Sequence, residues 1–186
     1  QSQAWLGSPP DLASIPCGNI TKQKAVWLTK TLLAYPPVSD HPQCPLQYTL
    51  HASSTASLQL TPRGISKADV ALPLALKSGG LPDDLAAKWP HLKDYDCLEL
   101  PGGGADVAQL VQCQLAVEVV DSRGRRVVDA SGVQLQGVLD DCFAYDGPLG
   151  AAIDPTTSSV SLRVWAPTAA SVTLLLFDTP RGGEEA

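Results

Sequence analysis

The chain has 186 residues, which is enough for one large domain or two small ones with a hydrophobic core. Hydrophobic residues make up 44% of the chain, as in a typical globular protein, and charged residues make up 17%. The net charge of −6 argues against nucleic acid and against an anionic membrane surface as partners, because both are bound through basic patches.

The sequence contains no apolar run of the roughly 20 residues that cross a bilayer, so we expect no membrane span. It has no methionine, and its first residues lack the basic and apolar regions of a secretory signal. We therefore expect a mature or shortened product of a longer reading frame.

The five cysteines are widely spaced and form no Cys-x-x-Cys pair, and the histidines do not stand near them at zinc-site spacing. This pattern predicts free thiols and neither a metal nor another cofactor. A single disulfide between two distant cysteines is the alternative. The cysteines are Cys17, Cys44, Cys97, Cys113 and Cys142.

Residues 1–23 have no hydrophobic period and are interrupted by proline and glycine, which predicts an extended lead-in. Two short apolar runs follow, at 25–28 and 32–35, separated by a polar Thr-Lys-Thr segment. Their spacing predicts a β-hairpin, which Pro36 and Pro37 would end.

Three further strands are predicted from alternating apolar residues, at 46–50, 58–60 and 70–76. A turn at 61–64 separates the second from the third. Pro73 lies in the middle of the third run, and a proline cannot donate a hydrogen bond to a neighbouring strand. We therefore expect 70–76 to be an edge strand.

Residues 82–89 begin with proline and two acidic residues and carry a lysine near their end, which predicts a short helix with Leu85 and Trp89 on its buried face. A second helical turn is predicted at 106–111. Alternation over 113–119 and the apolar pair 127–128 then predict a hairpin.

About ten short strands with little helix predict an all-β chain, and specifically an antiparallel, immunoglobulin-like β-sandwich with one or two short helices. A second β-sandwich is expected to begin near its end, where Val160, Leu162 and Val164 share one strand face and pair with 172–177. Two strands cannot bury a sandwich core, so we expect this second domain to be incomplete. The predicted divisions are a lead-in at 1–23, an N-terminal β-sandwich domain at 24–134, a connector at 135–158 and the start of the second domain at 159–186.

The paired carboxylates at 83–84, 140–141 and 184–185 do not form a glycosidase site, because that chemistry needs two acids on opposite sides of a bond, about 5–10 Å apart. The Gly-rich segment 102–104 lacks the residues of a phosphate-binding loop. The sequence therefore predicts no catalytic residue and no self-contained active site.

Aromatic residues are the remaining candidates for binding, because sugars present C–H faces that stack on flat rings. Trp27 and Tyr35, on the first predicted hairpin, are the candidate carbohydrate-binding residues. Packing in the core is the competing interpretation for every aromatic ring in the chain.

Several separated segments, in the same order, resemble the N-terminal region of pullulanase-type starch-debranching enzymes, in particular the limit dextrinases of plants and algae. They include residues 25–36, 78–92 (SGGLPDDLAAKWPHL), 106–116 and 145–151 (YDGPLGA). Residues 159–169 (SVSLRVWAPTA) resemble the entry to a carbohydrate-binding module of family 48.

The resemblance implies a parent α-1,6-glucosidase of glycoside hydrolase family 13 that acts on starch-derived α-glucans in the plastid. Its catalytic acids would lie in a barrel that this sequence lacks, so no catalytic residue carries over. The partners implied are an α-glucan and that catalytic barrel. The alternative is a general β-sandwich interaction module without a glycan role, and a glucan pull-down would separate the two.

Overall fold

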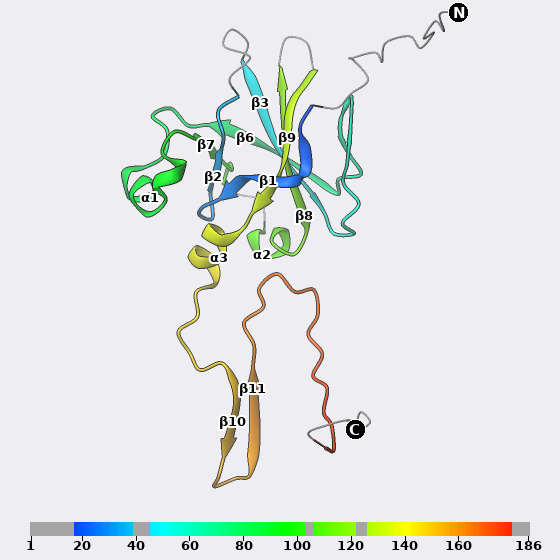
Figure 1. Ribbon diagram of the computed structural model, residues 1–186, viewed down its shortest axis with the longest axis vertical. Coiled ribbons are helices and arrows are strands. Elements are labelled where there is room, and N and C mark those ends of the chain that lie inside the picture. Colours follow the sequence, from blue (N-terminus) through cyan, green and yellow to red (C-terminus); the bar gives the residue numbers. More distant parts are fainter. Residues whose placement is uncertain (1–16, 39–44, 103–105, 122–125, 180–186) are drawn as a thin grey trace, which may run out of the picture. The chain divides into compact units, whose positions relative to one another are not determined.

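The computed structural model describes residues 17–38, 45–102, 106–121 and 126–179 (Figure 1). The chain divides into two compact units, Gln1–Asp146 and Gly147–Ala186, and each is described by itself.

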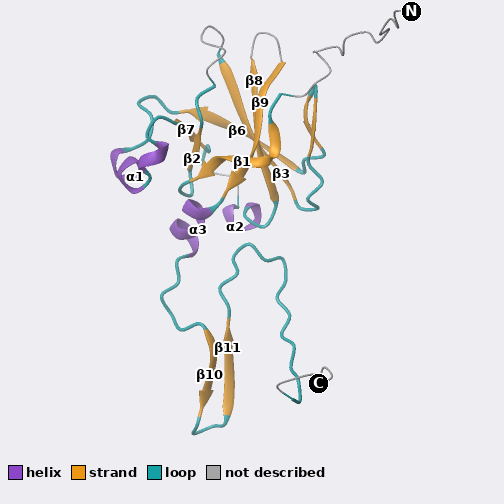
Figure 2. Cartoon of the chain, in the orientation of Figure 1, coloured by secondary structure: helices purple, strands orange, loops and turns teal. Residues whose placement is uncertain are grey.

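Seven strands of the first unit form one closed sheet, in the order β1, β2, β7, β6, β3, β8, β9 and back to β1 (Figure 2). Neighbouring strands are antiparallel, except that β1 and β9 run parallel. The strands are β1 Asn19–Trp27, β2 Leu32–Tyr35, β3 Leu46–Ser53, β6 Val70–Leu76, β7 Asp96–Glu99, β8 Gln114–Asp121 and β9 Arg126–Gln134.

The predicted β-rich class is confirmed, and helices are few and short. The division into the two sheets of an immunoglobulin-like sandwich is not seen, because seven of the described strands of this unit join into one closed sheet and the other two form a separate short hairpin. The parallel pairing of β1 with β9 closes the sheet. Sequence patterns did not indicate it, since the start of β1 is polar and its partner residues lie more than 100 positions away.

The core lies inside the closed sheet and follows the predicted alternation. On β3 and β8, Leu50 pairs with Val117 and Tyr48 pairs with Val119, and all four side chains are buried in one cluster. Side chains on a strand alternate between its two faces. The polar residues that lie between these buried positions along each strand therefore point to the outer face of the sheet.

The edge-strand prediction for 70–76 is wrong for the strand as a whole, since β6 has β3 on one side and β7 on the other. Its contact with β7 is limited to Ala75 and Leu76, however. Pro73 lies outside that short ladder and pairs with Thr49 of β3. The proline is therefore placed where no donor to β7 is needed.

The outer face of β1, β2 and β7 is covered by helix α1, Asp83–Lys88, and the short 3₁₀ helix η2, Pro90–Leu92. The predicted helix is thus confirmed, with two aspartates in its first turn and Lys88 in its last. Leu85 and Trp89 are partly buried against this second core cluster, as their spacing predicted. The Lys88 ammonium lies 5.5 Å from the centre of the Trp89 ring.

A small hairpin, formed by β4 (Gln59–Thr61) and β5 (Gly64–Ser66), is held to strand β8 by side chains. Glu118 accepts a hydrogen bond from the Ile65 N–H, and its other oxygen lies 3.7 Å from His51 Nε2. That separation is longer than a hydrogen bond, so the contact with His51 is an ion pair when the imidazole is protonated.

Glu118 makes the attachment of this hairpin dependent on pH. Burial raises the pKa of Glu118, but its contacts with His51 and the Ile65 N–H outweigh that effect and lower the pKa below its usual value. A lowered folded-state pKa means that ionised Glu118 stabilises the fold above its unfolded-state pKa, and that this stabilisation is lost as the pH falls through the folded-state pKa.

We expect the free energy of unfolding of Glu118→Gln to fall less steeply with decreasing pH than that of the parent protein. Glutamine keeps an acceptor for the Ile65 N–H but carries no charge that could be lost in acid. At neutral pH the cost should be on the order of 1 kcal/mol. Urea unfolding between about pH 7 and about pH 3 measures it. An acid dependence equal to that of the parent protein would show that Glu118 does not contribute.

Two more helices lie at one end of the closed sheet. Helix α2, Val107–Leu110, was predicted, and Asp106 caps it by accepting a hydrogen bond from the Ala108 N–H at 2.9 Å. Helix α3, Gln136–Phe143, was not predicted and lies within the segment expected to be a connector. It packs on the end of β1 through Val138, which is fully buried.

Within its described part, residues 147–179, the second unit contains one hairpin, β10 (Gly150–Asp154) with β11 (Ser159–Arg163). The predicted pairing of 159–164 with 172–177 is wrong, because β11 pairs with β10 and residues 171–176 are not assigned to a strand. The apolar side chains of this unit are exposed, among them Val160 at 60% and Leu174 at 58%.

Among the described residues, no helix is long and apolar enough to cross a membrane. The four described cysteines are free thiols, and Cys44 lies outside the described residues.

Candidate functional site

The structure places both predicted sugar-binding rings in the core. Trp27 and Tyr35 have no exposed surface, and they point into the closed sheet from β1 and β2. The prediction of an exposed stacking platform is therefore wrong, because a ring with no accessible face cannot stack on a sugar. Neighbouring positions such as Val26 and Ala34 are also apolar and buried, so the sequence did not reveal which face of the hairpin lies inside.

Tyr35 has a structural role in a polar group at the edge of the core. Its hydroxyl donates to Asp129 at 2.9 Å, and Asp129 also pairs with Lys24 at 3.1 Å. Tyr48 lies edge-on to Tyr35 and donates to Asp96. The pKa values of both tyrosines are raised well above the usual value for a tyrosine. Burial is the larger cause and the neighbouring carboxylates are the next, so both hydroxyls stay protonated and act as donors.

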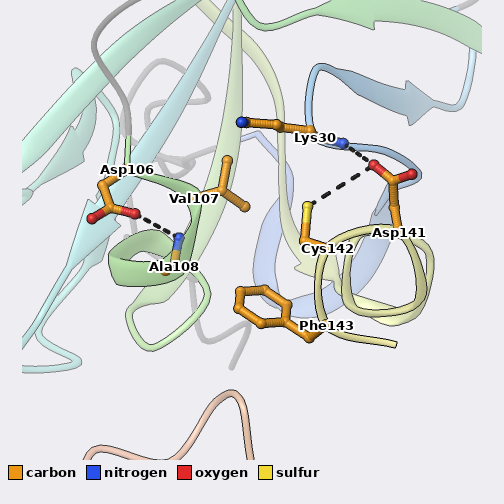
Figure 3. Close-up of a pocket in the computed structure, with 7 residues that line it drawn as sticks. All are labelled: Lys30, Asp106, Val107, Ala108, Asp141, Cys142 and Phe143. Carbon is orange, nitrogen blue, oxygen red and sulfur yellow. Dashed lines mark hydrogen bonds between the residues drawn. The ribbon is translucent and has the colours of Figure 1, made fainter. Parts of the chain in front are cut away.

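A cavity of about 520 Å³ lies where the β1–β2 turn, helix α2 and helix α3 meet (Figure 3). Its volume falls in the range of small-molecule sites, about 300–1,000 Å³. The lining residues are Lys30, Asp106, Val107, Ala108, Asp141, Cys142 and Phe143.

Two carboxylates that accept hydrogen bonds from main-chain N–H groups fix the shape of this cavity. Asp141 of α3 accepts a hydrogen bond from the Lys30 N–H at 2.8 Å, which ties the β1–β2 turn to the helix. Asp106 caps α2 on the other side. Each of these bonds uses one carboxylate oxygen, and the second oxygen has no hydrogen-bond partner among the described residues.

The ring of Phe143 points from the end of α3 towards α2, and the Lys30 side chain extends away from Asp141 along the opposite side of the cavity (Figure 3). Burial and the nearby Asp141 charge raise the pKa of the Cys142 thiol. A thiol that stays protonated is a poor nucleophile. The cavity therefore offers one aromatic ring and a few charged groups, which suits binding and not covalent chemistry.

Only part of this site could be recognised from the sequence. Asp106 stood at a predicted helix start, and Asp141 was considered only as one of two adjacent acids. The signal that was missed is the apolar spacing of Val138, Leu139 and Phe143, which lie partly or fully buried on one side of α3. No group of three potential metal ligands occurs among the described residues.

Comparison with known proteins gives the family. The model of the pullulanase N2 domain matches residues 22–141, which include the closed sheet except for the first three residues of β1, and most of α3. The chain belongs to the pullulanase N2 domain family. The resemblance of the sequence motifs to the N-terminal region of pullulanases is thereby confirmed.

Two curated relatives are similar to the N2 domain chain along most of its length. Pullulanase 1, chloroplastic, from Arabidopsis thaliana is 36% identical over 173 residues, which cover 93% of this chain and 17% of the relative. Pullulanase from Klebsiella pneumoniae is 28% identical over 169 residues, which cover 85% of this chain and 14% of the relative. The chain thus spans less than a fifth of the length of either one.

Solved structures of bacterial pullulanases share the fold. PulA from Klebsiella oxytoca matches with a TM-score of 0.72 and 26% identity, over 89% of this chain and 15% of that one. Klebsiella pneumoniae pullulanase complexed with maltotriose matches with a TM-score of 0.67 and 27% identity, over 82% of this chain and 14% of that one. The similarity extends beyond the 22–141 segment in both comparisons.

Proposed function

We propose that this N2 domain is a non-catalytic part of an α-1,6-glucosidase that debranches starch-type α-glucans in the plastid. The match of residues 22–141 to the pullulanase N2 domain carries this proposal. The plastid location is supported by the similarity to a chloroplastic pullulanase, and the α-glucan substrate by the relative solved with maltotriose.

Several carboxylates act as structural hydrogen-bond acceptors, which agrees with a non-catalytic role. Asp69 accepts from Ser54, Glu118 accepts from the Ile65 N–H, and Asp154 accepts from Thr157. The pKa of each of these three groups is lowered. Hydrogen bonds from Ser54 and Thr157 are the main causes at Asp69 and Asp154.

The second unit fits the start of a carbohydrate-binding module of family 48, as the sequence resemblance implies. Its β10–β11 hairpin leaves Val160 and Leu162 largely exposed, and such apolar strand faces are normally covered by further β structure. In a longer enzyme, that module and a catalytic barrel would be the neighbours of the N2 domain.

We expect the chain alone to release no reducing ends from pullulan above an enzyme-free blank. A chimera tests whether the domain can serve as part of a pullulanase. In it, residues 22–141 replace the matching segment of the Arabidopsis chloroplastic pullulanase. Pullulan hydrolysis within a few-fold of the parent enzyme is expected. Reducing-end release by the isolated chain would contradict the non-catalytic role, and a folded but inactive chimera would favour a general interaction module.

A further inference from the structure

The β4–β5 hairpin is attached to the rest of the first unit by few contacts. Residues 57–66, which we call the strap, contribute no side chain to either core cluster of the described chain. At the base of the strap, the Leu58 N–H donates to Gln114 at 2.9 Å, and Asp69 accepts from the N–H and the hydroxyl of Ser54. A segment with so few apolar contacts can open while the remainder of a domain stays folded.

The backbone is strained on both sides of the strap. Ala56 precedes it with a φ angle of 52°, and Lys67 follows it with a φ angle of 61°. Both angles lie in the left-handed region, which residues with a Cβ rarely adopt. These two positions fit hinges, because backbone strain that is stored in one position of a segment is released when the segment moves.

Beside the strap, on the outer face of β3, lies a histidine whose ring is poorly satisfied. The His51 side chain is only 10% exposed, and neither ring nitrogen has a hydrogen-bond partner among the described residues. Nε2 lies 3.7 Å from Glu118, so protonation of the ring would form an ion pair there and still leave Nδ1 without a partner. A buried polar group of this kind favours any movement that lets water reach it.

Glu118 of β8 connects the strap to this ring. One of its carboxylate oxygens accepts a hydrogen bond from the Ile65 N–H of the strap, and the other oxygen faces His51. The main chain of the strap also approaches the carboxylate closely at Gly64, where a Cβ would lie 2.6 Å from Oε2. The strap is thus docked on a single charged group that also contacts the histidine.

We propose that the strap opens and docks again over the outer face of β3 and β8 while the closed sheet stays folded. Glu118 is the latch that holds the strap in place, and the two hinges and the unpaired His51 ring favour opening. The open state exposes the His51 ring, so the domain presents this imidazole to solvent only part of the time. This device is independent of the proposed function.

Hydrogen exchange of the intact 186-residue chain at a fixed pH of about 7 tests the proposal. We expect the Ile65 amide to exchange at least about tenfold faster than the amides of β3 and β8, which report opening of the sheet. Glu118→Gln keeps an acceptor but removes the charge of the latch, so exchange at Ile65 should become about tenfold faster.

Two substitutions of the histidine test its role in opening. His51→Phe keeps a flat ring and removes both unpaired nitrogens, and His51→Leu does the same with a side chain that is no larger than histidine. Each should slow exchange at Ile65 about tenfold, relative to the amides of β3 and β8. His91→Phe is the matched control, because His91 is exposed on η2, and it should leave exchange at Ile65 unchanged.

Modification with diethyl pyrocarbonate gives a second measurement, since this reagent reacts with an imidazole that solvent can reach. His51 should react at least about tenfold more slowly than His91, because it is accessible only in the open state. Glu118→Gln should accelerate the reaction at His51 and leave His91 unaffected. Mass spectrometry of the digested chain separates the two sites.

Three results would overturn the proposal. Exchange at Ile65 that is no faster than in β3 and β8 would show that the strap opens only with the whole sheet. Unchanged or faster exchange in both His51 variants would show that the ring does not favour opening. Equal reactivity of His51 and His91 would show that the strap does not shield the ring.

Discussion

Replacing Trp27 by alanine should destabilise the first unit by about 3–5 kcal/mol, the cost of deleting a fully buried large aromatic side chain. The ring fills the interior of the closed sheet, and the strands around it cannot collapse into the space without breaking their register. Because a small domain has only about 5–15 kcal/mol of stability, this loss should remove a substantial share of it. Urea unfolding followed by far-UV circular dichroism measures the loss.

Trp165→Ala is the matched control, since this ring is 42% exposed and belongs to the second unit. Its effect on the unfolding of the first unit should stay within about 0.5 kcal/mol. A loss below about 1 kcal/mol for Trp27→Ala would mean that the ring is not part of a tightly packed core.

Gly137→Ala should move helix α3 away from the closed sheet. A Cβ at this position would lie 2.6 Å from the Leu28 Cα and 2.7 Å from the Trp27 carbonyl oxygen, both of them backbone atoms that cannot turn aside. Overpacking of this kind costs about 1–3 kcal/mol, while alanine recovers up to about 1 kcal/mol of helix propensity. We expect a net loss of about 1–2 kcal/mol in unfolding free energy.

The same shift would move Asp141 away from the Lys30 N–H, so amide exchange at Lys30 should speed up even where the domain stays folded. Gly102→Ala is the control, because nothing lies within 4 Å of a Cβ at that glycine. Equal stability of the two variants, with unchanged exchange at Lys30, would show that α3 does not depend on this close contact.

The sequence revealed most strands of the closed sheet, but it missed β7 and failed to show how the strands assemble. Alternation located β3 and β8 because one face of each is buried and the other is polar, so the period is visible. The first hairpin was found from its two apolar runs, but its orientation was lost because Trp27 faces the core and Val26 and Leu28 face a second buried layer. Burial on both faces removes the signal that would distinguish them.

The site was hidden for a different reason. Lys30, Asp106 and Asp141 come from three distant segments, and only the packing of α2 and α3 at one end of the sheet brings them together. The sequence around α3 is a mixture of glycine, acids and apolar residues, which was interpreted as a connector. The family, in contrast, was recognised correctly, since it depends on the order of local motifs and not on their contacts in space.

The parallel pairing of β1 with β9 also bears on how the domain forms during synthesis. β1 is the first strand of the sheet in the chain and β9 the last, with Ala25 opposite Val133. Closing the ring therefore requires a contact across most of the domain, and such long-range contacts form slowly because a large loop must be ordered first. On the ribosome, strands β1 to β8 emerge before β9, the strand that completes the ring. Until β9 emerges, the nascent sheet has two open edges, and the closing strand is the one that removes them both.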